Sequence, residues 1–95
     1  MTVEEIKASV LRGCAFSGQA WGAMSVADPE SALAVGAGDV KAAIEAELDS
    51  ILMALVGNLS LRRDGRFMDR ARATLLEHAA IATRQALEAA QVTLH

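Results

Sequence analysis

The stretch RFMDRARATLLEHAAIATRQALEAAQVTL, residues 66–94, decides the fold. Its apolar side chains recur at steps of three and four residues, the spacing that places them on one face of an α-helix. That face consists of Leu75, Leu76, Ala79, Ala82, Ala86, Leu87, Ala90 and Leu94. Charged side chains lie opposite, and Arg84 precedes Glu88 by four residues, a spacing at which the two can form an ion pair. The pattern predicts one long helix over about residues 64–93.

Two other segments show the same helical spacing. Residues 3–24 start with a capping box, in which Thr2 and Glu5 satisfy amide groups at a helix start. A second apolar seam is formed by Val40, Ile44, Leu48, Ile51 and Leu55. The sequence therefore predicts two further helices, over about residues 3–24 and 40–57.

The first of these helices carries small residues along its apolar stripe. They are Gly13, Cys14, Ser17, Gly18 and Gly22. Each glycine weakens a helix by up to about 1 kcal/mol, because it leaves the unfolded backbone more freedom. We expect close contact with another backbone to compensate for this loss, and a helix break near Gly18 is the alternative.

The connector between the first two helices contains a helix-start signal. Asp28-Pro29-Glu30 supplies a capping residue, a proline suited to the first helical position, and a negative charge near the positive end of the helix dipole. We expect a short connector helix over about residues 29–35. A mobile loop is the alternative.

The predicted elements define the fold class. None of the segments shows the alternation of apolar and polar residues that is typical of a strand. Ninety-five residues are enough for one domain, although a small one. We therefore predict an all-α protein with a single helical domain over residues 1–95. Its architecture is expected to be a small antiparallel helical bundle of three long helices plus the short connector helix.

The composition favours association with another chain. Twenty residues are Ala, and 29 are Val, Ile, Leu, Met, Phe or Trp. Burial stabilises by roughly 25 cal/mol per Å² of apolar surface, so an alanine-rich core is thin. We expect a homo-oligomer or a helical protein partner rather than a stable monomer. The predicted interface residues are Trp21, Met24, Leu76, Leu87 and Leu94; for Trp21 and Met24, core packing and a small-molecule pocket are alternatives.

Five of the nine basic residues gather within eleven positions around the start of the last helix. They are Arg62, Arg63, Arg66, Arg70 and Arg72. In a continuous helix, Arg63, Arg66 and Arg70 would share one face, which suits phosphate or carboxylate groups. Arg62, Arg63, Arg66 and Arg70 are therefore the candidate anion- or partner-binding residues, and a solvated polar face is the alternative.

The sequence shows no catalytic, cofactor-binding or metal-binding constellation. The only cysteine, Cys14, lies on an apolar stripe and is expected to be a buried thiol. His78 lies beside the apolar face of the last helix, and we expect a local hydrogen bond rather than a metal or catalytic role. We therefore predict no enzyme activity and no cofactor.

The net charge and the hydropathy of the chain limit its expected cellular location and its expected partners. The formal net charge is −3, and the longest dense apolar run, Ile51 to Val56, is too short to span a bilayer. We expect a cytoplasmic protein without a membrane partner; the preference for Ala, and for Arg over Lys, indicates a bacterial source.

The resulting function hypothesis is a non-enzymatic helical protein–protein interaction module, such as an adaptor, a regulator or an accessory subunit, that self-associates. Nucleic-acid or phospholigand binding through residues 62–72 is the alternative.

Overall fold

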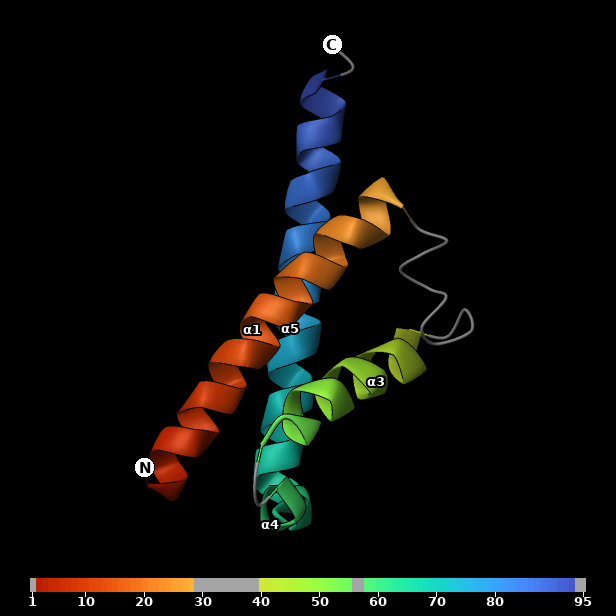
Figure 1. The fold of residues 1–95 in the computed structure, drawn as a ribbon. Coiled ribbons are helices and arrows are strands. Elements are labelled where there is room, and N and C mark those ends of the chain that lie inside the picture. Colours follow the sequence, from red (N-terminus) through yellow and green to blue (C-terminus); the bar gives the residue numbers. More distant parts are fainter. Residues whose placement is uncertain (1, 29–39, 56–57, 94–95) are drawn as a thin grey trace.

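The computed structural model describes residues 2–28, 40–55 and 58–93. Within these ranges the protein is helical and contains no strand, so the all-α prediction is confirmed there. The helices are α1 (Val3–Ala27), α3 (Val40–Met53), α4 (Asn58–Arg63) and α5 (Gly65–Thr93), shown in Figure 1. The predicted connector helix over residues 29–35 lies outside the described residues.

The helix limits differ from the sequence predictions at three places. Helix α1 continues to Ala27 without a break at Gly18, and its start is capped by Thr2, whose hydroxyl accepts a hydrogen bond from the Glu5 amide at 3.1 Å. Helix α3 ends at Met53, earlier than the predicted residue 57. The short helix α4 was not predicted at all.

Asp64 explains why α4 and α5 are separate helices. Its carboxylate accepts a hydrogen bond from the Phe67 amide at 3.1 Å, and its carbonyl accepts one from the Met68 amide at 2.9 Å. Asp64 is therefore the N-cap of α5, a position at which aspartate is strongly preferred. The same carboxylate pairs with the Lys7 ammonium of α1 at 2.8 Å, and that ammonium lies 5.6 Å from the centre of the Phe67 ring. One side chain thus starts α5 and ties it to α1.

Replacing Asp64 by asparagine keeps a capping oxygen but removes the charge. The hydrogen bond from Lys7, followed by that from the Phe67 amide, holds the pKa of Asp64 below its ordinary value of 3.8. The stabilisation by the carboxylate is therefore complete above pH 3.8 and is lost as the pH falls through the lower pKa of the folded state. We expect Asp64→Asn to be less stable than wild type at neutral pH, and the difference to shrink below pH 3.8. Urea unfolding over a pH series measures this, and an unchanged difference in acid would contradict it.

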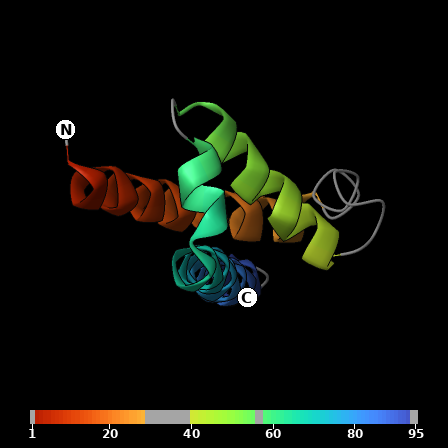
Figure 2. The same cartoon turned by 90° about the horizontal axis from the view of Figure 1, so that it is seen from below.

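Helices α1 and α5 cross each other and run in the same direction, as Figure 1 shows. Across their contact the residue numbers rise together: Lys7 meets Asp64, Gly18 lies against Leu75, and Ser25 meets Thr83. Helix α3 runs the opposite way along α1, because Gly13 lies near Ile51 and Ser17 donates a hydrogen bond to Glu47 at 2.7 Å. Figure 2, which looks along α5, shows α1 and α3 on the same side of it.

The predicted antiparallel three-helix bundle is not confirmed. The main contact joins the two long helices that run in parallel, whereas α3 lies obliquely against them and contacts each less extensively. The physical reason is the close approach of α1 to α5. A Cβ atom on Gly18 would lie 2.5 Å from the Leu75 carbonyl oxygen, and one on Gly22 would overlap the Ala79 carbonyl oxygen. Backbone meets backbone here, as the small residues of α1 predict.

The core lies below this crossing in the view of Figure 1, where α1, α3, α4 and α5 each contribute side chains. Its buried members are Val10, Cys14, Ile44, Leu48, Leu52, Leu61, Phe67, Met68, Ala71 and Leu75. Trp21, Ala43 and Ala79 form a second buried cluster. Because the crossing is so close, one side of α5 is covered by α1, and the adjoining side remains open.

Candidate interaction surface

The apolar face of α5 is divided into a covered half and an exposed half. Leu75, Ala79 and Ala82 are buried. Leu76 and Leu87 lie on the adjoining side of the helix and remain 49% and 50% exposed. Between and beyond these two leucines lie Ala80, Thr83 and Ala90, of which only Thr83 is partly buried. We call Leu76, Ala80, Thr83, Leu87 and Ala90 the α5 seam.

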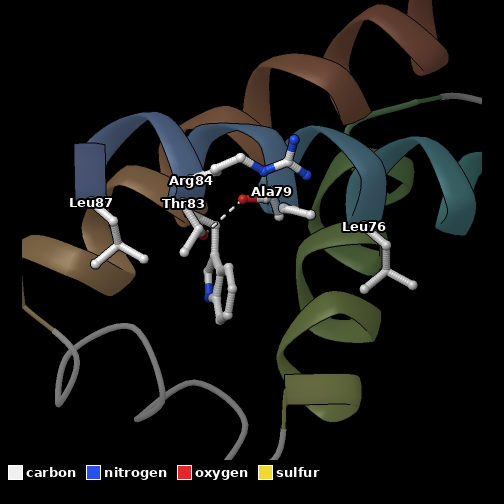
Figure 3. Close-up of a pocket in the computed structure, with 7 residues that line it drawn as sticks. Leu76, Ala79, Thr83, Arg84 and Leu87 are labelled. Atoms are coloured by element: carbon white, nitrogen blue, oxygen red, sulfur yellow. Dashed lines mark hydrogen bonds between the residues drawn. The ribbon is translucent and has the colours of Figure 1, made fainter. Parts of the chain in front are cut away.

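The seam borders a hollow beside Trp21, shown in Figure 3. The hollow has a volume of about 380 Å³ and is lined by Trp21, Leu76, Ala79, Ala80, Thr83, Arg84 and Leu87. Leu76 and Leu87 project to the same side of α5 (Figure 3). Apart from Arg84 and the Thr83 hydroxyl, the lining side chains are apolar or, for Trp21, aromatic, so the surface suits another apolar side chain better than a polar ligand.

A second hollow adjoins the first through Leu76. It has a volume of about 440 Å³ and lies between α3 and α5. Its lining residues are Lys41, Ile44, Glu45, Arg72 and Leu76. The two hollows share Leu76, and the second also has the charged side chains of Lys41, Glu45 and Arg72 in its lining.

The structure brings together three of the five predicted interface residues. Trp21, Leu76 and Leu87 line the same hollow. Trp21 is only 8% exposed, because most of its indole packs in the second buried cluster. Trp21 therefore both packs in the core and lines the hollow. Met24 is exposed on α1 but does not line this hollow. Leu94 lies outside the described residues.

The C-terminal part of α5 extends past its crossing with α1, as Figure 1 shows. The Thr83 hydroxyl is near the end of the contact: it donates to the Ala79 carbonyl at 2.8 Å and lies 3.3 Å from the Ser25 hydroxyl. From Arg84 to Ala90, every side chain except the partly buried Ala86 is exposed. Leu87 therefore lies on a helix that projects from the rest of the molecule.

Two charged side chains flank the α5 seam on one side. Glu77 follows Leu76, and Arg84 follows Thr83. Arg84 and Glu88, whose spacing allows an ion pair, do not form one; within the described ranges Glu77 and Arg84 have no ion-pair partner.

The arginine cluster is split by the break at Asp64. Arg62 pairs with Asp49 at 2.6 Å, and Arg72 pairs with Glu45 at 2.5 Å. Both carboxylates belong to α3, so these two arginines form ion pairs with that helix. Arg63 is exposed at the end of α4. Its predicted common face with Arg66 and Arg70 required one continuous helix, which the structure does not contain.

Arg66 and Arg70 of the cluster line a common hollow. It has a volume of about 280 Å³ and is shared with Glu4, Lys7, Asp64 and Phe67. The two carboxylates in this lining lower its positive charge, and Lys7 is already paired with Asp64. The hollow is therefore a weak site for a phosphate group.

Cys14 and His78 are the two side chains that the sequence offered as candidates for reactivity. Cys14 is fully buried, and burial raises the pKa of its thiol to about 11, so it is a neutral thiol at physiological pH. The Nδ1 atom of His78 lies 3.4 Å from the side-chain amide nitrogen of Gln19 on α1, so this contact joins two helices and is not the local hydrogen bond that was predicted. Among the residues that the structure describes, no three His, Cys, Asp or Glu side chains are placed to hold a metal ion.

Comparisons with protein-family models, with curated proteins and with solved structures found no match to this chain. None of the helices within residues 2–28, 40–55 and 58–93 combines the length and the apolar character needed to cross a membrane.

Proposed function

We propose that this chain is a non-enzymatic helical protein–protein interaction module, an adaptor, regulator or accessory subunit, that self-associates through the open side of α5. The observation that carries the proposal is the exposure of Leu76 and Leu87 on one side of a single helix, beside an apolar hollow. Such residues recur at sites where a second helix packs, because burying them removes apolar surface from water.

The chemistry of the hollow supports binding rather than catalysis. Among the described residues that line it, Arg84 is the only ionisable side chain, and there is no carboxylate, imidazole or thiol. Proton transfer by a lining side chain is therefore not expected. A partner that supplies apolar side chains would replace the water in the hollow and gain stability from the burial.

Sedimentation equilibrium over a dilution series tests self-association. We expect a reversible equilibrium, with dimer at about 100 µM and a growing monomer fraction towards about 1 µM. Circular dichroism at each concentration checks that the helices persist. A chain that stays monomeric and fully helical throughout this range would contradict self-association.

Nucleic-acid or phospholigand binding is the second proposal, and it has weaker support. It rests on Arg63, Arg66 and Arg70, because Arg62 and Arg72 are held by carboxylates of α3. Phosphate contacts make affinity fall steeply with salt, so a titration with a short oligonucleotide at two salt concentrations distinguishes the two proposals. A lack of binding at low salt would exclude nucleic acid.

A further inference from the structure

The α5 seam has the spacing of a coiled coil. Its members follow one another at steps of four, three, four and three residues, which is the alternation of a heptad repeat. Helix α1 covers the adjoining stripe of Leu75, Ala79 and Ala82 and reaches the seam at Thr83, whose hydroxyl contacts Gly22 and Ser25. The other four seam residues are exposed and are not covered by another helix within the described residues. A second helix is therefore the expected occupant.

We propose that the α5 seam pairs with the α5 seam of a second copy of this chain in antiparallel orientation. The inference rests on the proposed function and names its partner and geometry. A two-fold axis between Ala80 and Thr83 would place Leu76 opposite Leu87 of the partner subunit, and Ala80 opposite Thr83 of the partner subunit. The same two contacts repeat on the other side of the axis, so the interface closes on itself.

Side-chain size fits this pairing. The central layers contain Ala80 and Thr83, whose small side chains let two helices approach closely. The outer layers each join two leucines, which supply most of the buried apolar surface. Leu87 of the partner subunit would reach Leu76, the residue shared by the two hollows, and the projecting end of each α5 would be covered by the other subunit.

Charge complementarity selects a second copy and the antiparallel orientation. Glu77 and Arg84 occupy equivalent positions of successive heptads, and such positions face each other across an antiparallel pair. Glu77 would therefore meet Arg84 of the partner subunit, and Arg84 would meet Glu77 of the partner subunit. Neither side chain has an ion-pair partner among the described residues of its own chain.

The parallel orientation does not offer the same pairing. Arg84 would then face Ala79 of the partner subunit, and in each copy Ala79 is buried beneath α1. Glu77 would face Arg72 of the partner subunit, and in each copy Arg72 is already held by Glu45 at 2.5 Å. The antiparallel arrangement is the one that pairs Glu77 with Arg84, both of which lack an ion-pair partner among the described residues.

The first experiment measures dimer affinity by sedimentation equilibrium for full-length variants. Leu76→Gln and Leu87→Gln are each expected to weaken the dimer at least about tenfold, because each substitution removes two apolar contacts per dimer. Ile81→Gln is the matched control, since Ile81 is an exposed apolar residue of the same helix outside the seam. It should change the affinity less than about threefold. Circular dichroism verifies that all three variants remain folded.

The second experiment tests the orientation by charge reversal at low ionic strength. Glu77→Arg and Arg84→Glu are each expected to weaken self-association by about three- to tenfold, because they place like charges opposite each other. An equimolar mixture of the two single variants, or the double variant E77R/R84E, should regain wild-type affinity. A mixture that associates no better than either variant alone would overturn the antiparallel pairing.

The outcomes separate this inference from the proposed function. If wild type dimerises and the glutamine variants dimerise equally well, the chain self-associates through another surface and the seam pairing is wrong. If wild type remains monomeric at about 100 µM, self-association itself is wrong. Weakening by Leu76→Gln and Leu87→Gln, together with rescue by charge reversal, would support both.

Discussion

Gly22→Ala is expected to destabilise the protein by about 3 kcal/mol, because the added methyl group has no space. A Cβ atom on Gly22 would overlap the Ala79 carbonyl oxygen and lie 3.0 Å from the Ala82 Cβ. The first of these atoms belongs to the backbone of α5, so no side-chain rotation relieves the clash. The two long helices would have to move apart along their whole contact, and the hydrogen bonds of Thr83 near Gly22 would lengthen. Urea unfolding followed by circular dichroism measures the loss.

Gly13→Ala is the matched control on the same helix. A Cβ atom there would lie 3.5 Å from the Ile51 Cγ2, which is an ordinary van der Waals contact. Alanine is a better helix former than glycine by about 1 kcal/mol, so this variant should be as stable as wild type or more stable. If Gly22→Ala were stabilised to the same degree as Gly13→Ala, the close crossing of α1 and α5 would be wrong.

Leu48→Ala is expected to cost about 2–5 kcal/mol, because it leaves a cavity where α3 meets the core. Leu48 is 1% exposed and packs with Val10 and Leu75, among others. The ion pairs of Glu45 and Asp49 with α5 and α4 are partly exposed, and such pairs contribute little by themselves. The burial of Leu48 and its neighbours is therefore the main attachment of α3.

Met53→Ala provides the comparison for Leu48→Ala, since Met53 lies on the same helix and is 70% exposed. Its substitution should change the free energy of unfolding by less than about 0.5 kcal/mol. The difference between the two variants in urea unfolding reports the packing of α3 against the core. Equal effects would show that α3 does not dock through Leu48.

Much of the candidate surface could be predicted from residue spacing. Leu76 and Leu87 were expected at an interface, and the structure places both beside the same hollow as Trp21. The spacing did not reveal that Leu75 would be buried and Leu76 exposed. Both lie on the broad apolar face, and only the position of α1 buries the first and leaves the second half exposed.

The arginine cluster shows a different limit of sequence reasoning. A local signal for the break was present, because Asp64 is a strong N-cap residue three positions before Phe67. The partners of Arg62 and Arg72 carried no such signal. They are Asp49 and Glu45 of α3, which come near only after the chain has folded. A cluster that is dense in the sequence is therefore divided between structural ion pairs and exposed side chains.

The sequence by itself determined the helical character of the described segments, the Thr2 cap and the small residues at which two backbones meet. These properties follow from φ/ψ preferences, capping chemistry and side-chain volume, which are local. The tertiary structure alone decided the parallel crossing of α1 and α5, the oblique position of α3 and the open half of the α5 face. Helical periodicity sets the angle of each side chain around its own axis, but it does not specify which neighbour arrives there.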